Sequence, residues 1–260
     1  MGTHVSSPSK VATSGELLSD YLKENQDIGA KSADRFGVSD GGLPFLFKVL
    51  SIEKALSIQT HPDRTTAEKL HAEQPHIYRG AHGRMPPPHL LTQPTDGNHK
   101  PEMAIALTPF SALCGFLPID RIVSYLEEVP EFAGLIPVAI RKAFIASASS
   151  PETGGVLREL FTSLMTAEGG QFVPALEALV ERYRAGRANE REYQLVDLVI
   201  RLHDQFPGDI GVFCPFVLNY VELEKGEAIF LGAGEPHAYV SGGEDQGQGK
   251  GEDLIKSFQI

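Results

Sequence analysis

The sequence has few cysteines, no long apolar run and a shortage of basic side chains. Its two cysteines, Cys114 and Cys214, are too few for a disulfide framework, and their apolar surroundings predict buried thiols. No apolar run reaches the roughly 18 residues that a membrane span needs, and the chain does not open with a signal peptide pattern. Lys and Arg number 23 against 34 Asp and Glu, which argues against non-specific nucleic-acid binding. An anionic ligand must therefore be gathered by local basic residues.

What is present is an ordinary globular composition. The chain has 260 residues, 42% of them apolar and 22% charged, which is enough for a real core in one large domain or two small ones. The first six residues fit a myristoylation pattern. A cytoplasmic protein without a membrane partner nevertheless remains the default expectation.

Hydrophobic periodicity changes twice along the chain. Short apolar or alternating runs predict strands at residues 45–50, 56–59, 103–107, 212–221 and 228–231. Between them, four apolar stripes at helical spacing predict helices over most of residues 120–206. Shorter helices are expected within residues 15–25 and 63–73, and a polar loop over residues 30–42.

One alternating stretch carries polar groups suited to a ligand. On a strand, Leu56 and Ile58 would occupy one face, and Ser57, Gln59 and His61 the other. A strand with one apolar face, whose other face ends in glutamine and histidine, is a candidate wall of a binding site.

Two further stretches add donors of the same chemistry. Glu102 opens a predicted strand on the side that carries the small Ala104, and His237 follows a glycine-rich turn. Together with Gln59 and His61 they form a nitrogen and oxygen set that suits zinc with open positions. The alternative is a polar cluster without a metal.

Long segments of the chain resemble the type I mannose-6-phosphate isomerase family. The resemblance covers most of the chain as far as residue 242. It is carried by residues 45–50, 56–62, 98–110, 113–116, 125–132, 207–211 and 235–239, which read FLFKVL, LSIQTHP, NHKPEMAIALTPF, LCGF, YLEEVPEF, PGDIG and EPHAY.

The resemblance implies a fold and a division into domains. The fold is a mainly β cupin (jelly-roll) barrel with an inserted all-α helical domain. The resemblance further leads us to expect a chain truncated at both ends relative to the family, and therefore an incomplete barrel. The cupin domain is expected at residues 1–117 and 208–242 and the helical insertion at residues 118–207. Residues 243–260 would then be a disordered tail outside the family pattern.

The resemblance also assigns roles to residues. It makes Gln59, His61, Glu102 and His237 the ligands of one zinc ion. It places Ser57 and Lys100 at the phosphate or hydroxyls of a sugar phosphate, with Lys48 near the substrate. Tyr239 shares a face with His237 and is expected to line the pocket, with plain core packing as the alternative.

The implied activity is a zinc-dependent interconversion of mannose 6-phosphate and fructose 6-phosphate by a monomer. Zinc suits this reaction because a Lewis acid stabilises the negative charge that develops on oxygen. The catalytic acid and base stay unassigned, because the family segment with an acidic residue, an asparagine and an arginine is replaced here by the tail. Poor turnover is therefore expected. A non-catalytic cupin-type protein that binds a metal or a sugar phosphate is the alternative.

A second departure from the family pattern falls at residues 79–93, rich in proline and histidine. It is interpreted as a surface insertion, a lineage-specific lid or an untranslated segment read as coding, with the last favoured. In all three interpretations it is expected to lack regular packing.

Overall fold

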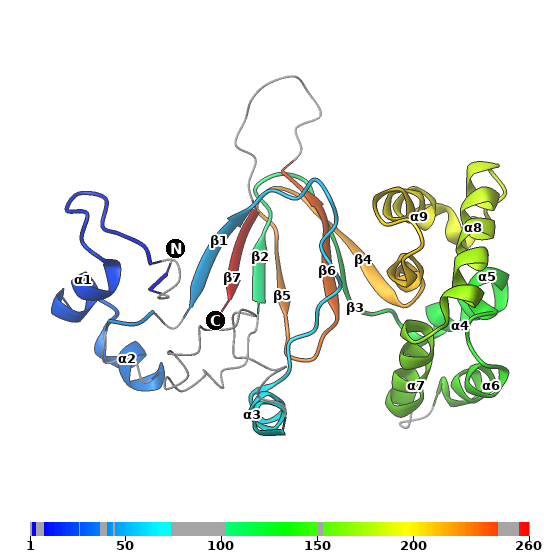
Figure 1. Cartoon of the computed structure of the whole chain (residues 1–260), viewed down its shortest axis with the longest axis horizontal. Coiled ribbons are helices and arrows are strands. Elements are labelled where there is room, and N and C mark those ends of the chain that lie inside the picture. Colours follow the sequence, from blue (N-terminus) through cyan, green and yellow to red (C-terminus); the bar gives the residue numbers. More distant parts are fainter. Residues whose placement is uncertain are drawn as a thin grey trace, which may run out of the picture.

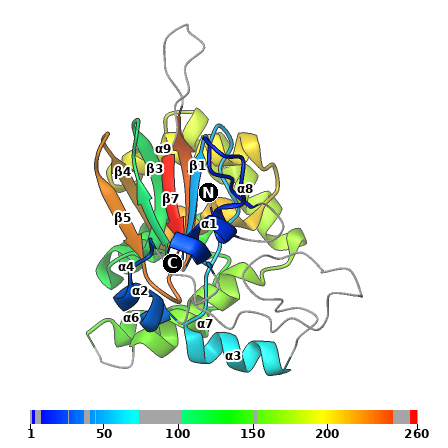
Figure 2. The ribbon, with the colours of Figure 1, turned by 90° about the vertical axis from the view of Figure 1, so that its left-hand side faces the viewer.

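The computed structural model describes residues 2–3, 8–25, 27–36, 41–43, 45–73, 102–149, 153–243 and 255–259. The strands lie in the middle of the molecule, with α1 and α2 on one side and the helices α4–α9 on the other (Figure 1, Figure 2). The α-helices are α1 (Leu18–Asn25), α2 (Ala30–Phe36), α3 (Arg64–Glu73), α4 (Ile119–Glu128), α5 (Pro130–Ala133), α6 (Val138–Ser147), α7 (Thr153–Met165), α8 (Gly169–Arg184) and α9 (Tyr193–Gln205). Within the described residues, η2 (Glu190–Glu192) and η3 (Ile210–Phe216) are 3₁₀ helices.

The strands form two antiparallel sheets. They are β1 (Leu46–Leu50), β2 (Glu102–Ile105), β3 (Phe110–Phe116), β4 (Leu218–Leu223), β5 (Ala228–Leu231), β6 (His237–Gly242) and β7 (Ile255–Gln259). The four-stranded sheet has the order β1-β7-β2-β5, and the three-stranded sheet has the order β4-β3-β6. Neighbours in sheet order are far apart in sequence, so the chain crosses between the sheets repeatedly.

A shared core joins the two sheets. The four-stranded sheet contributes Ala104 and Leu231, and the three-stranded sheet contributes Phe110, Ala112 and Tyr239. Because alternate residues of a strand share a face, the small Ala104 lies on the face of Glu102. The ring of Tyr239 packs edge-on against that of Phe110, with centroids 5.4 Å apart. This core therefore includes residues of both β2 and β6, the strands that begin with Glu102 and His237.

The helices α4–α9, here the helical unit, pack around a second and larger core. The expectation of helices over most of residues 120–206 is confirmed. Phe216 lies at the centre of an aromatic group, with ring centroids 5.3 Å from Tyr125, 5.3 Å from Phe132 and 6.3 Å from Phe213. Full burial of one such side chain contributes roughly 1.5–3 kcal/mol, so this core accounts for much of the stability of the helical unit.

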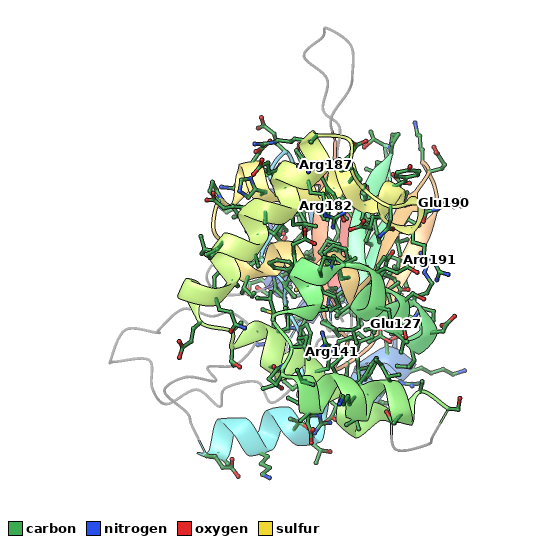
Figure 3. The ribbon with its side chains drawn as sticks, turned by 90° about the vertical axis from the view of Figure 1, so that its right-hand side faces the viewer. Glu127, Arg141, Arg182, Arg187, Glu190 and Arg191 are labelled. Atoms are coloured by element: carbon green, nitrogen blue, oxygen red, sulfur yellow. The ribbon has the colours of Figure 1, made fainter. Side chains whose placement is uncertain are left out.

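A charged network ties three elements of the helical unit together. Arg182 of α8 forms paired hydrogen bonds with Glu131 of α5, at 2.8 and 2.9 Å, and with Glu192 of η2, at 2.6 and 2.8 Å. Glu192 is fully buried and also accepts a 2.8 Å hydrogen bond from the hydroxyl of Tyr183. Arg182 lies amid the helices, whereas Glu190 and Arg191 lie toward their edge (Figure 3).

Burial and hydrogen bonding oppose each other at Glu192. Burial alone would raise the pKa of this carboxyl group. The hydrogen bonds from Arg182, from the backbone of Asn189 and from Tyr183 outweigh burial and hold the pKa below its ordinary value of 4.5. Glu192 is therefore ionised in the folded protein at neutral pH.

Two strand predictions need correction. Residues 56–58 form no regular strand, and Gln59 makes only an isolated bridge to His237. The reason is packing: Ala55 and Ile58 both contact the core of the helical unit, which breaks the expected alternation. Residues 212–216 belong to η3, because Pro215 has no N–H to donate to a sheet; the strand begins only at Leu218. The strands predicted at residues 45–50, 103–107 and 228–231 are present as β1, β2 and β5.

The expected disorder of the tail is wrong for its last residues. Ile255–Gln259 is β7, which pairs with both β1 and β2 inside the four-stranded sheet. A strand in this place satisfies the backbone N–H and C=O groups of both neighbours. Residues 244–254 and the departure at residues 79–93 lie outside the described residues.

Residues 30–36 form α2, not the loop that was expected, since alanine, lysine and arginine favour helix.

Both cysteines are buried and free, as predicted. Burial raises the pKa of the Cys114 thiol to about 12, with a smaller contribution from the charge of Glu235. Burial likewise raises the pKa of the Cys214 thiol to about 12. Both groups are therefore protonated at neutral pH.

Among the described residues, no helix has both the length and the apolar character needed to cross a membrane.

Candidate metal centre

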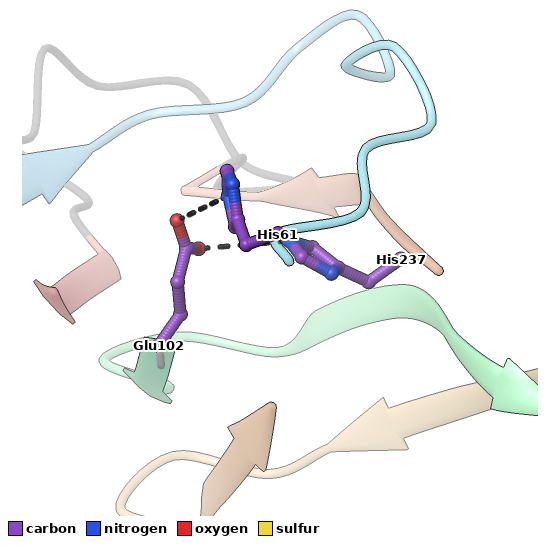
Figure 4. A group of neighbouring side chains, drawn as sticks. All are labelled: His61, Glu102 and His237. Carbon is purple, nitrogen blue, oxygen red and sulfur yellow. Dashed lines mark hydrogen bonds and ion pairs between the residues drawn. The ribbon is translucent and has the colours of Figure 1, made fainter. Parts of the chain in front are cut away.

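Three side chains from three distant segments converge on one point. They are His61, from the segment before α3, Glu102, the first residue of β2, and His237, the first residue of β6 (Figure 4). The Nε2 atom of His61 lies 3.1 Å from Oε1 of Glu102, and the Nε2 atom of His237 lies 3.7 Å from Oε2. One donor atom from each residue lies within 4.8 Å of the others.

The sheets hold Glu102 in place. In β2 it pairs with Leu231 of β5 on one side and with Gln259 of β7 on the other. Its side chain is only 6% exposed, and a buried carboxylate must be paired, hydrogen-bonded or bound to a metal. The hydroxyl of Tyr239 donates a 3.0 Å hydrogen bond to Oε2 of Glu102. Strand position and hydroxyl together direct the carboxylate toward the two histidines.

Backbone hydrogen bonds bring the two histidines together. The backbones of Gln59 and His237 each donate a 2.8 Å hydrogen bond to the carbonyl of the other. The N–H of Gly234 donates a 2.7 Å hydrogen bond to the carbonyl of His61. Gly234 has φ of +81°, which a residue with a side chain rarely adopts. The glycine-rich turn thus fixes His237 against the segment that carries His61, and the ring centroids lie 5.5 Å apart.

The second ring nitrogen of His237 has its own partner. Nδ1 lies 3.0 Å from the carbonyl oxygen of Glu235, an atom that can only accept a hydrogen bond. Nδ1 is therefore the donor in this hydrogen bond, which leaves Nε2, the nitrogen that faces Glu102, as the atom that a metal would bind. Metal-binding histidines are oriented in this way in proteins.

This donor set fits a divalent transition metal. Two imidazoles and one carboxylate are ligands that zinc accepts. Ligands at about 2.1 Å around a tetrahedral ion lie about 3.4 Å from one another, and the two nitrogen to oxygen distances of 3.1 and 3.7 Å lie on either side of that value. Three protein ligands around zinc leave a position open, as in catalytic zinc sites.

The other predicted site residues fall in different places. Gln59 and Ser57 are exposed, and Gln59 is joined to His237 through the backbone alone in the contacts described above. Lys48 is exposed on β1. It pairs with Ser257 of β7, and Ser257 pairs with Ala104 of β2. Lys48 therefore lies on the same face of the sheet as Ala104 and Glu102. Tyr239 is 5% exposed and bonded to Glu102, a contact that the sequence did not predict. Lys100 lies outside the described residues.

Two family descriptions match the chain. "Phosphomannose isomerase type I, catalytic domain" matches residues 1–86 and 89–119. "Phosphomannose isomerase type I, helical insertion domain" matches residues 138–218. The two matched regions together take in His61 and Glu102 and most of the helical unit.

Individual proteins similar in sequence to this chain are mannose-6-phosphate isomerases. The chain is 42% identical over 264 residues to a mannose-6-phosphate isomerase of Cryptococcus neoformans, covering 93% of this chain and 57% of that protein. It is 43% identical over 250 residues to the mannose-6-phosphate isomerase of Homo sapiens, covering 93% and 55%. The chain thus spans a little over half the length of the relatives that it matches.

Solved structures are similar in fold. A zinc-bound crystal structure of a mannose 6-phosphate isomerase matches with a TM-score of 0.69 at 30% identity, covering 99% of this chain and 58% of that one. A crystal structure of a variant phosphomannose isomerase from Salmonella typhimurium matches with a TM-score of 0.70 at 30% identity, covering 100% and 59%.

Proposed function

Because the chain belongs to the type I phosphomannose isomerase family, we propose that it is a zinc-dependent isomerase of mannose 6-phosphate and fructose 6-phosphate. The observation that carries this proposal is the convergence of His61, Glu102 and His237, one donor atom from each within 4.8 Å of the others. Glu102 and His237 come from different sheets, so the three side chains meet where the two sheets approach each other. The similar proteins of Cryptococcus neoformans and Homo sapiens are named mannose-6-phosphate isomerases.

The zinc ligands in this proposal are His61, Glu102 and His237, with the amide of Gln59 as a fourth. Gln59 supports this role through its position, since its backbone is bonded to that of His237 two residues before His61. Zinc supplies Lewis acidity toward the oxygens of the bound sugar. The buried carboxylate and the fixed ring of His237 keep the ligand geometry constant, so little reorganisation is needed when the metal binds.

The substrate in this proposal lies at the edge of the same site. Ser57 supplies a hydroxyl group, and Lys100 and Lys48 supply positive charge for the phosphate in a chain whose net charge is −11. Lys48 is supported by its place on the sheet face of Glu102. We also propose residues 1–117 and 208–242 as the domain that binds zinc and substrate, and residues 118–207 as the helical domain inserted in it.

A coupled assay with parallel zinc analysis tests the function. We expect the zinc-loaded protein to convert mannose 6-phosphate, a strong chelator to stop the reaction, and added zinc to restore it. Stoichiometric zinc with no turnover would contradict the isomerase and favour the non-catalytic binding protein. Absence of zinc binding at micromolar metal would contradict the centre itself.

The hydrogen bond from Tyr239 to Glu102 predicts a measurable effect on metal binding. Tyr239→Phe removes the hydroxyl that orients Oε2 and leaves the ring packed against Phe110. We expect zinc affinity to fall about 10-fold, the lower end of what outer-shell partners contribute. Competition with a chromophoric chelator measures the affinity. Tyr220→Phe is the matched control, because its hydroxyl bonds Glu222 on β4; equal affinities for the two variants would refute the role of Tyr239.

A further inference from the structure

The helical unit holds the chain just before the first metal ligands. The side-chain amide of Gln205, the last residue of α9, makes two backbone hydrogen bonds there. Its oxygen accepts from the N–H of Ala55 at 2.9 Å, and its nitrogen donates to the carbonyl of Glu53 at 3.3 Å. Arg201, one turn earlier, donates to the same carbonyl at 3.0 Å. An amide bonded at both ends fixes the direction of the backbone as well as its position.

Packing supports the same attachment. Ala55 is 6% exposed and belongs to the core of the helical unit, against which Ile58 also packs. A Cβ atom at Gly211 of η3 would lie 3.5 Å from Cδ1 of Ile58. The amine of Lys54 lies 4.3 Å from the ring centroid of Phe206. Residues 53–58 therefore belong to the surface of the helical unit as much as to the sheets.

The same segment leads directly to the metal centre. The N–H of Leu56 donates to the carbonyl of Tyr239 at 2.9 Å, and Gln59 and His237 are joined by two backbone hydrogen bonds. His61 follows two residues later. His61 therefore lies six positions after Ala55, whose N–H is held by Gln205. The residues between Ala55 and His61 form no regular strand, so separate hydrogen bonds to β6, and not a continuous ladder, hold this segment beyond Ala55.

We propose that Gln205 is a positioning residue for the metal centre, acting through Ala55 to set the place of Gln59 and His61. The inference rests on the proposed function, because it takes His61 as a ligand of zinc. Metal binding needs the donor atoms held within a few tenths of an ångström of their bound positions. Loss of the amide releases the start of the segment, so part of the binding energy of zinc is then spent on ordering it.

Gln205→Met tests the proposal. Methionine keeps the length of the side chain and a high helix propensity but forms neither hydrogen bond. We expect zinc affinity, measured by competition with a chromophoric chelator on the whole chain, to fall roughly 3- to 10-fold, less than the ~10–100-fold for partners bonded directly to a ligand. Gln194→Met is the matched control, an exposed glutamine on the same helix, and should bind zinc like the wild type.

A second measurement separates positioning from general stability. Thermal unfolding is recorded for the metal-free and the zinc-saturated forms of each protein. Positioning predicts that zinc raises the unfolding temperature less in Gln205→Met than in Gln194→Met. Equal zinc affinity and an equal zinc-induced rise in both variants would overturn the proposal, even if Gln205→Met were less stable without metal.

Two further outcomes are informative. If Gln205→Met does not fold, Gln205→Ala also removes both hydrogen bonds and keeps a high helix propensity. The same comparison with Gln194→Ala then applies, and unchanged affinity there would overturn the proposal. If the wild-type chain binds no zinc, the proposed function fails. Wild-type zinc binding with no effect of Gln205 leaves the proposed function standing and rejects only the positioning role.

Discussion

His237→Ala is expected to lose zinc binding almost completely. The ring of His237 is 5% exposed, its Nδ1 is bonded to the carbonyl of Glu235, and its Nε2 faces the carboxylate of Glu102. Alanine removes one of the two imidazole donors of the proposed ligand set. The loss of affinity should exceed the ~10–100-fold typical of outer-shell partners. His61→Ala should behave alike, because the two imidazoles flank the same carboxylate.

Zinc content after dialysis, together with chelator competition, measures this loss. His203→Ala is the matched control, since His203 lies on α9 beside Asp204, away from the three converging side chains. The control should retain wild-type zinc. Wild-type affinity in both His61→Ala and His237→Ala would mean that zinc binds elsewhere, and the centre would have to be abandoned.

Arg182→Met is expected to destabilise the protein strongly. The guanidinium group satisfies Glu131 and Glu192, whose side chains are 12% and 0% exposed. Removing it leaves the buried Glu192 and the partly buried Glu131 without their cationic partner, and breaking a buried ion pair in this way costs about 3–5 kcal/mol. At about 2–4 °C per kcal/mol for a protein of this size, the unfolding temperature should fall by about 6–20 °C.

Urea or thermal unfolding at neutral pH measures this change. Arg184→Met is the matched control on the same helix, because it loses only an exposed ion pair with Asp204, which is typically worth about 0–1 kcal/mol. Similar stabilities of the two variants would show that the network around Arg182 contributes little.

The pH dependence of this network has a definite sign. Because the folded-state pKa of Glu192 lies below its ordinary value of 4.5, its contribution is fully present above that pH. The contribution is lost as the pH falls through the folded-state pKa. The stability gap between the wild type and Glu192→Gln should therefore narrow below pH 4.5 and stay constant between pH 6 and 8. A gap that widens in acid would contradict this assignment.

The sequence placed His61, Glu102 and His237, together with Gln59, in one predicted ligand set, and in the structure these first three side chains converge. Glu102 and His237 lie on strands or turns whose local pattern is clear, and their spacing matches a recognisable family. The hydrogen bond that orients Glu102 could not be predicted from the sequence. Its donor, Tyr239, lies 137 positions away, and local sequence patterns do not indicate contacts between residues so far apart. The hydrogen bond between Gln205 and Ala55 was not predictable for the same reason, because the two residues are 150 positions apart.

Local rules failed where tertiary packing decides the structure. Residues 56–59 alternate like a strand, yet Ala55 and Ile58 turn toward the helical unit, so the alternation was misleading. In the tail, glycine and glutamine dominate residues 243–251 and conceal the strand Ile255–Gln259. That strand forms because β1 and β2 offer unpaired backbone groups on either side, which only the folded sheet reveals.

The long sequence distances within the metal centre determine when it can form. His61 and Glu102 are 41 positions apart, and the backbone pairing of Gln59 with His237 closes a loop that contains the whole helical unit. Closing such a loop is entropically costly until the helices inside it are compact. We therefore expect the centre to assemble late in folding. On that expectation, zinc bound there would slow unfolding more than it speeds folding, and the lifetime of the folded chain would lengthen with metal.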